Sequence, residues 1–106
     1  MSYRYMRIMV LFDLPVETVE HRRAYRKFRK ALIRHGFMMF QESVYIKLAL
    51  NPTAQKTIMN NIRRLSPKEG LINMLCLTEK QFQRIECVVG KNRSELISST
   101  ERLVIL

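Results

Sequence analysis

Residues 7–34 constrain this chain more than any other stretch. They begin inside a nearly continuous apolar run, 6–12, which is typical of a strand buried on both faces in the middle of a sheet. Asp13, the only aspartate of the chain, follows this run, and Pro15 ends the strand because proline has no amide hydrogen for the sheet. The next segment is helical and carries seven basic residues within 22–34. A carboxylate at a strand end beside a cationic helix favours phosphate chemistry.

The net charge narrows the choice of partner. The 106 residues make one domain, 1–106, in which 19 lysines and arginines against nine acidic residues give a formal charge of +10. A polyanion is the partner that such a charge favours, and nucleic acid is the first candidate. No apolar run approaches the roughly 18 residues that a membrane span needs, and the N-terminus lacks a signal-peptide pattern. We therefore expect a cytoplasmic protein that does not contact a membrane.

Caps and apolar periodicity predict the remaining elements. Thr18 is expected to cap the basic helix and Gly36 to end it. Asn51 followed by Pro52 predicts the start of a second helix. Strand-like runs at 37–40 and 43–50 predict a hairpin that turns at 41–42, with a bulged or bent strand as the alternative. Further strands are expected at 71–77 and 83–89 and in the tail.

This order of elements is β-α-β-β-α-β with one or two added strands at the C-terminus. We therefore predict an α+β, ferredoxin-like fold in which both helices cover one face of an antiparallel sheet. The strands are apolar on both faces, so the bare face predicts a homodimer with its sheets stacked face to face. The tail, 96–106, is expected to pair with a sheet of its own or of a partner subunit through Leu103, Val104, Ile105 and Leu106.

The cations of the first helix have no acidic partners four residues away, which predicts phosphate contact rather than a merely soluble surface. They form two rows, one with Arg22, Arg26 and Arg29 and one with Arg23, Lys27, Lys30 and Arg34. Contacts to the nucleic-acid backbone rather than to bases are expected, because the strands lack interleaved aromatic and basic residues. The candidates, led by those nearest Asp13, are Arg22, Arg23, Arg26, Lys27, Lys30, Arg63, Arg64, Lys91 and Arg93.

Several features of the sequence, in their order along the chain, resemble those of a known family. They are the strand ending in Phe12-Asp13-Leu14-Pro15, the basic helix, Gly36, and then Gln41-x-Ser43-Val44-Tyr45. Over its whole length the chain resembles the small CRISPR-associated Cas2 proteins, most closely those beside Cas9 effectors. The resemblance implies a homodimer that bridges two dimers of the Cas1-family integrase subunit and holds double-stranded DNA destined for a CRISPR array. Other adaptation proteins of the same locus are further implied partners.

The resemblance also implies a magnesium-dependent nuclease acting on single-stranded RNA or double-stranded DNA. Asp13 matches the family's catalytic aspartate, and the two copies in a dimer would share a Mg²⁺ that polarises a phosphate and activates water. Many members have a tyrosine before this aspartate, where this chain has Phe12 and so lacks the hydroxyl. The simpler interpretation of Asp13 is a residue that turns the strand end. Three functions remain open: a DNA-bridging adaptation subunit, an endonuclease that uses Asp13, and an RNA-binding ferredoxin-like module.

Overall fold

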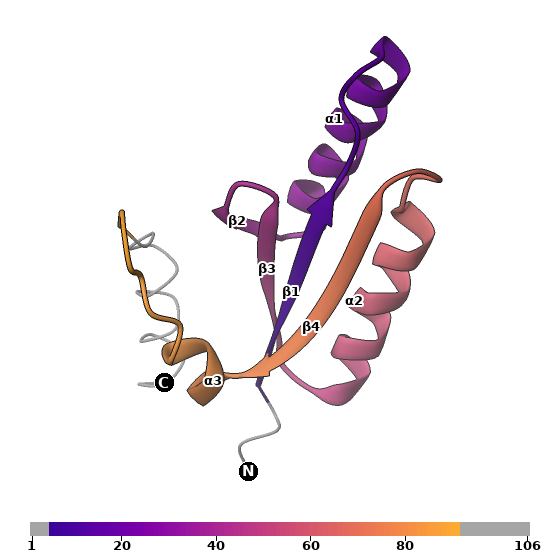
Figure 1. Cartoon of the computed structure of the whole chain (residues 1–106). Helices are drawn as coiled ribbons and strands as arrows, with labels where there is room; N and C mark the ends of the chain where they lie inside the picture. Colours follow the sequence, from indigo (N-terminus) through magenta and orange to yellow (C-terminus); the bar gives the residue numbers. More distant parts are fainter. Residues whose placement is uncertain (1–4, 92–106) are drawn as a thin grey trace.

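The computed structural model describes residues 5–91, which form one four-stranded antiparallel sheet and three helices. The strand order is β2-β3-β1-β4, with β1 between its two antiparallel neighbours (Figure 1). This is the ferredoxin-like arrangement, so the predicted fold class is confirmed. The elements in chain order are β1 (Met6–Asp13), α1 (Val19–Arg34), β2 (Met38–Gln41), β3 (Val44–Ala49), α2 (Pro52–Leu65), β4 (Leu71–Thr78) and α3 (Glu79–Gln83).

Both long helices begin where their caps predict. The side chain of Thr18 accepts a hydrogen bond from the amide of His21 at 3.0 Å, and the side chain of Asn51 accepts one from the amide of Ala54 at 2.7 Å. These contacts satisfy amides that have no partner within the helix. Helix α1 ends at Arg34, and Gly36 follows with a φ of +90°, a conformation that glycine adopts without strain.

The hairpin between β2 and β3 turns one residue later than predicted. Gln41 still belongs to β2 and pairs with Val44, so the two connecting residues are Glu42 and Ser43. Ser43 has a φ of 65°, and its carbonyl accepts the amide of Phe12 at 3.0 Å. The predicted alternative of a bulge is confirmed, because the register of β2 shifts between Met39 and Gln41.

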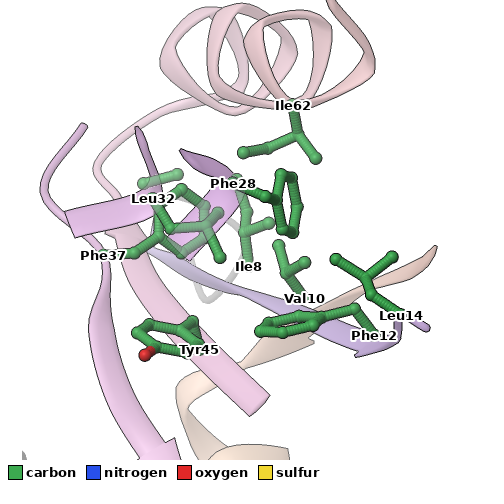
Figure 2. Packing of buried hydrophobic residues seen from close by; sticks show 10 residues of the cluster. Ile8, Val10, Phe12, Leu14, Phe28, Leu32, Phe37, Tyr45 and Ile62 are labelled. Atoms are coloured by element: carbon green, nitrogen blue, oxygen red, sulfur yellow. The ribbon is translucent and has the colours of Figure 1, made fainter. Parts of the chain in front are cut away.

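The main core lies between the sheet and the helices α1 and α2. Alternate residues of β1 (Ile8, Val10 and Phe12) face this layer, because successive side chains of a strand point to opposite faces. Figure 2 shows these side chains below Ile62 of α2, with Phe28 and Leu32 of α1 between them. The ring of Phe12 is edge-to-face with that of Phe28 at 5.3 Å. Both helices therefore pack on one face of the sheet, as predicted.

The predicted strand at 83–89 is wrong, because helix α3 extends to Gln83 and residues 84–89 form no strand. Thr78 and Gln81 form a reciprocal capping box that begins a helix directly after β4. Phe82 of this helix is buried against the other face of the sheet, in a small cluster with Met9 and Ile46. Arg7 lies over the ring of Phe82 at 4.6 Å, and its Nε donates to Glu79 at 2.6 Å.

Several predictions are not tested by this structure. The tail 96–106, with Leu103, Val104, Ile105 and Leu106, lies outside the described residues, and the homodimer also stays a prediction. Within 5–91, none of the helices is long and apolar enough to cross a bilayer.

Candidate nucleic-acid interface

An open groove lined by five cations runs along α1. Each of these cations is three or four residues from another, so together they cover one side of the helix. From the first to the last the groove extends about 16 Å, over which a DNA strand carries several phosphates. No carboxylate lines it. The lining residues are Arg23, Arg26, Lys27, Lys30, Ala31 and Arg34, which we call the α1 groove.

The apolar side of α1 holds the groove in place. Phe28 and Leu32 are buried in the core beneath the helix, and the cations of the groove are exposed. The amphipathic pattern of the sequence therefore fixes which side of α1 meets the sheet. The basic side is left available to an external polyanion.

Two cations of α1 are engaged within the chain. The Nη1 of Arg22 donates to the carbonyl oxygens of Val16 and Glu17, at 3.0 and 3.2 Å, and so fastens the loop before the helix. The Nε of Arg29 donates to the hydroxyl of Tyr45 at 2.8 Å. Arg22 therefore differs from Arg23 and Arg26, with which the sequence analysis grouped it, because part of its hydrogen-bonding capacity is used by the loop.

The other predicted contacts lie away from the α1 groove. Arg63 and Arg64 are exposed in the last turn of α2, where they donate to the side chains of Asn60 and Asn61. Lys91 is exposed and is the last described residue, while Arg93 lies outside the described range. The structure thus groups Arg23, Arg26, Lys27 and Lys30 from the predicted set and leaves Arg22, Arg63, Arg64 and Lys91 elsewhere.

Asp13 is exposed at the end of β1, on the face of the sheet that α1 and α2 do not cover. Successive side chains of a strand point to opposite faces, and Phe12 faces the helices. Asp13 therefore points to the other face, together with Met9 and Leu11. Its partner across the sheet is Leu71 of β4. In the described chain no hydrogen bond or ion pair joins Asp13 to a cation of α1. The carboxylate and the basic helix are therefore neighbours in sequence but belong to opposite faces of one subunit.

A metal ion would find few ligands in one subunit. Among residues 5–91, no three histidine, cysteine, aspartate or glutamate side chains are close enough together to hold a metal. A Mg²⁺ ion typically takes one or two protein carboxylates, together with water and phosphate. Asp13 of one chain could supply a single carboxylate, so a two-carboxylate site would need a second copy.

Two features of the interface were not predicted from the sequence. Arg34 was placed in a row of cations but not among the contact residues, although its spacing of four from Lys30 was a usable signal. The hydrogen bond between Arg29 and Tyr45 joins α1 to β3, and the spacing within either element gives no sign of it. Tyr45 itself is buried and stacks on Phe12 at 5.7 Å between ring centres.

Comparisons with known proteins show the family and support the fold. A family model described as CRISPR associated protein Cas2 matches residues 6–85. A relative from Treponema denticola, named CRISPR-associated endoribonuclease Cas2, is 48% identical over 101 residues, which cover 95% of this chain and 100% of the relative. A relative of the same name from Streptococcus mutans is 45% identical over 101 residues, covering 95% and 93%. A solved crystal structure of Cas2 shares the fold, with a TM-score of 0.57 at 18% identity, covering 85% of this chain and 92% of that one.

Proposed function

Because this chain belongs to the Cas2 family of CRISPR-associated proteins, we propose that it is the DNA-bridging subunit of a spacer-acquisition complex. In this role a homodimer bridges dimers of the integrase subunit and binds prespacer duplex through its phosphates. The α1 groove is the observation that carries the proposal. Its five cations lie side by side with no carboxylate among them, and a polyanion relieves their mutual repulsion.

The chemistry of the groove favours recognition of the backbone. Lysine and arginine side chains on one side of a helix can contact successive phosphates, which fixes the position of a duplex without reading its sequence. An adaptation complex handles spacers of many sequences, and a binding surface without base contacts suits that task.

Exposed apolar side chains support the dimer. Leu75 pairs with Met9, and Leu71 pairs with Asp13, so both leucines belong to the face that α1 and α2 leave open. Their exposed fractions are 48% and 58%. A second copy stacked on this face would remove them from water, and it would also bring a second Asp13 to the same side of the assembly.

The salt dependence of duplex binding separates the groove from the rest of α1. The logarithm of affinity should fall with the logarithm of salt concentration by about 0.9 for each phosphate neutralised. Arg26→Ala should therefore reduce the slope by about 0.9, whereas Arg22→Ala should change it less, because Arg22 donates to loop carbonyls. Fluorescence anisotropy with a labelled duplex at several salt concentrations measures both slopes. A nearly flat response of the wild type would contradict phosphate binding.

The second candidate function is magnesium-dependent cleavage of RNA or DNA at Asp13. It is favoured by the exposed position of this carboxylate at the end of β1, and the relatives carry the name endoribonuclease. A bound Mg²⁺ would polarise the phosphate and activate a water molecule. In this account two copies of Asp13 would hold the ion, since residues 5–91 of one chain bring no three candidate ligands together.

Replacing Asp13 tests this second function. Asp13→Asn keeps the size of the side chain but removes the charge that would bind the metal, so any magnesium-dependent cleavage of labelled RNA or DNA should be lost. Duplex affinity should stay unchanged, because Asp13 is not part of the α1 groove. Glu42→Gln, at the exposed hairpin turn, is the matched control and should cleave like the wild type. Cleavage that persists in purified Asp13→Asn protein would rule out Asp13 as the metal ligand.

A further inference from the structure

A second concave site lies at the end of the sheet opposite α3 (Figure 1), where the connection between α2 and β4 contacts α1 through Glu69 and His21. The loop after β1 supplies Leu14 and Pro15, and Pro67 comes from the connection between α2 and β4. Helix α1 contributes the small side chain of Ala24. This site, which we call the Glu20 pocket, is lined by Leu14, Pro15, Glu20, His21, Ala24, Pro67, Lys68 and Glu69.

The charge around the Glu20 pocket is opposite to that of the α1 groove. Glu20 and Glu69 line it, and Glu17 has a carboxylate oxygen 3.9 Å from the ring of His21. Lys68 is the one lysine or arginine among the lining residues. All three glutamates are exposed. In a chain with a formal charge of +10, this end of the molecule therefore carries an acidic rim around an apolar floor.

The walls of the pocket are held by contacts within the subunit. The Nε2 of His21 lies 3.3 Å from Glu69, which joins α1 to the connection before β4. Gly70, next to Glu69, approaches the loop after β1 closely: a Cβ at this position would come within 2.6 Å of Leu14 and 3.0 Å of the carbonyl oxygen of Asp13. Pro15 and Pro67 further restrict the backbone. Because the walls are already held in place, a ligand would bind with little further loss of conformational freedom in the protein. This favours affinity in a small site.

The Glu20 pocket and the α1 groove lie next to one another on the same helix. Glu20 is three residues from Arg23, and Ala24 is three residues from Lys27, so the pocket borders the groove along the surface of α1. The two sites share no lining residue, so a small ligand in the pocket would leave the groove cations uncovered.

From this geometry we propose that the Glu20 pocket binds a segment of a partner protein in which one apolar side chain stands next to lysine or arginine. The apolar side chain fills the floor formed by Leu14, Ala24 and the two prolines. The neighbouring cation faces Glu20 and Glu69. Charge complementarity selects this occupant, because a cation would be attracted by Glu20 and Glu69, whereas an acidic side chain would face two carboxylates. This site is separate from the α1 groove, so the proposal stands apart from the proposed function.

Short peptides provide the probe. Acetyl-Arg-Leu-Arg-amide is added to the ¹⁵N-labelled full chain, and amide chemical shifts are followed by NMR. We expect a saturable shift confined to the lining residues, among them Leu14, His21, Ala24 and Lys68. Acetyl-Glu-Leu-Glu-amide should cause no such shift, and acetyl-Arg-Gly-Arg-amide should bind more weakly because it lacks the apolar side chain.

Two variants test the charge and the volume of the pocket separately. The double change Glu20→Gln and Glu69→Gln should weaken binding of the basic peptide about fivefold, the effect expected for losing two exposed charge pairs. Ala24→Leu should abolish binding by filling the floor without any change of charge. The matched control, Glu42→Gln with Glu86→Gln, removes two exposed carboxylates that do not line the pocket and should bind like the wild type.

The proposal fails if the acidic peptide binds as well as the basic one, or if the basic peptide causes no saturable shift at the lining residues. It also fails if the glutamine pair at positions 20 and 69 leaves affinity unchanged. The glutamine variant alters only exposed side chains, so the protein should remain folded. Its amide spectrum checks this directly.

Discussion

Reversing three cations of the α1 groove, by Arg23→Glu, Arg26→Glu and Lys27→Glu, is expected to weaken duplex binding at least about 100-fold. In the proposed complex each change would remove one contact to a phosphate and place a negative charge beside it. If each lost contact contributes about 1 kcal/mol, three of them already account for this factor before repulsion is counted. All three side chains are exposed, so the fold should be retained. Anisotropy titration at fixed salt gives the affinities.

A matched triple variant separates the groove from the net charge. Lys56→Glu, Arg63→Glu and Arg64→Glu produce the same change in formal charge on exposed positions of α2. The proposed role of the groove predicts a much smaller loss of affinity for this variant. Equal losses in the two triple variants would mean that duplex binding follows total charge and that the groove has no special part in it.

Phe28→Ala is expected to lower the free energy of unfolding by about 3–5 kcal/mol. Phe28 is 2% exposed, and its ring packs edge-to-face on Phe12 and fastens α1 to the sheet. Truncation would leave a cavity beneath the helix, and the loss is a large part of the roughly 5–15 kcal/mol that stabilises a typical domain. Urea denaturation followed by circular dichroism measures the change.

Ile33 supplies the control on the same helix. Its exposed fraction is 49%, so Ile33→Ala should change the free energy of unfolding by only about 0.5 kcal/mol. A loss for Phe28→Ala no larger than that for Ile33→Ala would contradict the assignment of Phe28 to the core. Because the same packing orients the α1 groove, the Phe28 variant should also bind duplex more weakly near its unfolding midpoint.

Local signals in the sequence were enough to predict most elements. The caps at Thr18 and Asn51 act over three residues, and the apolar run of β1 is long enough to identify a central strand. The segment 83–89 was wrongly predicted as a strand because its apolar residues alternate as they do in a strand. The capping box of Thr78 and Gln81 begins a helix just before this segment, and the burial of Phe82 packs that helix on the sheet. The burial of Phe82 is a tertiary contact.

The candidate site was predictable only in part for a similar reason. Helical spacing predicts that α1 has a basic side, but it cannot tell that loop carbonyls hold Arg22 or that Tyr45 holds Arg29. The position of Asp13 depends on which side of β1 the helices cover. Since residues 6–12 are apolar on both faces, the pattern left that choice open, and the fold places Asp13 on the open face.

The most direct test of the central claim is spacer integration into a plasmid that contains a CRISPR repeat, with the co-purified integrase subunit and this protein. Wild type, Asp13→Ala and the triple reversal of Arg23, Arg26 and Lys27 are compared. If the protein acts as a scaffold that holds duplex on its α1 groove, Asp13→Ala integrates as the wild type does and the triple reversal does not integrate. Failure of Asp13→Ala, in protein that still folds and binds duplex, would contradict this account and make the carboxylate essential.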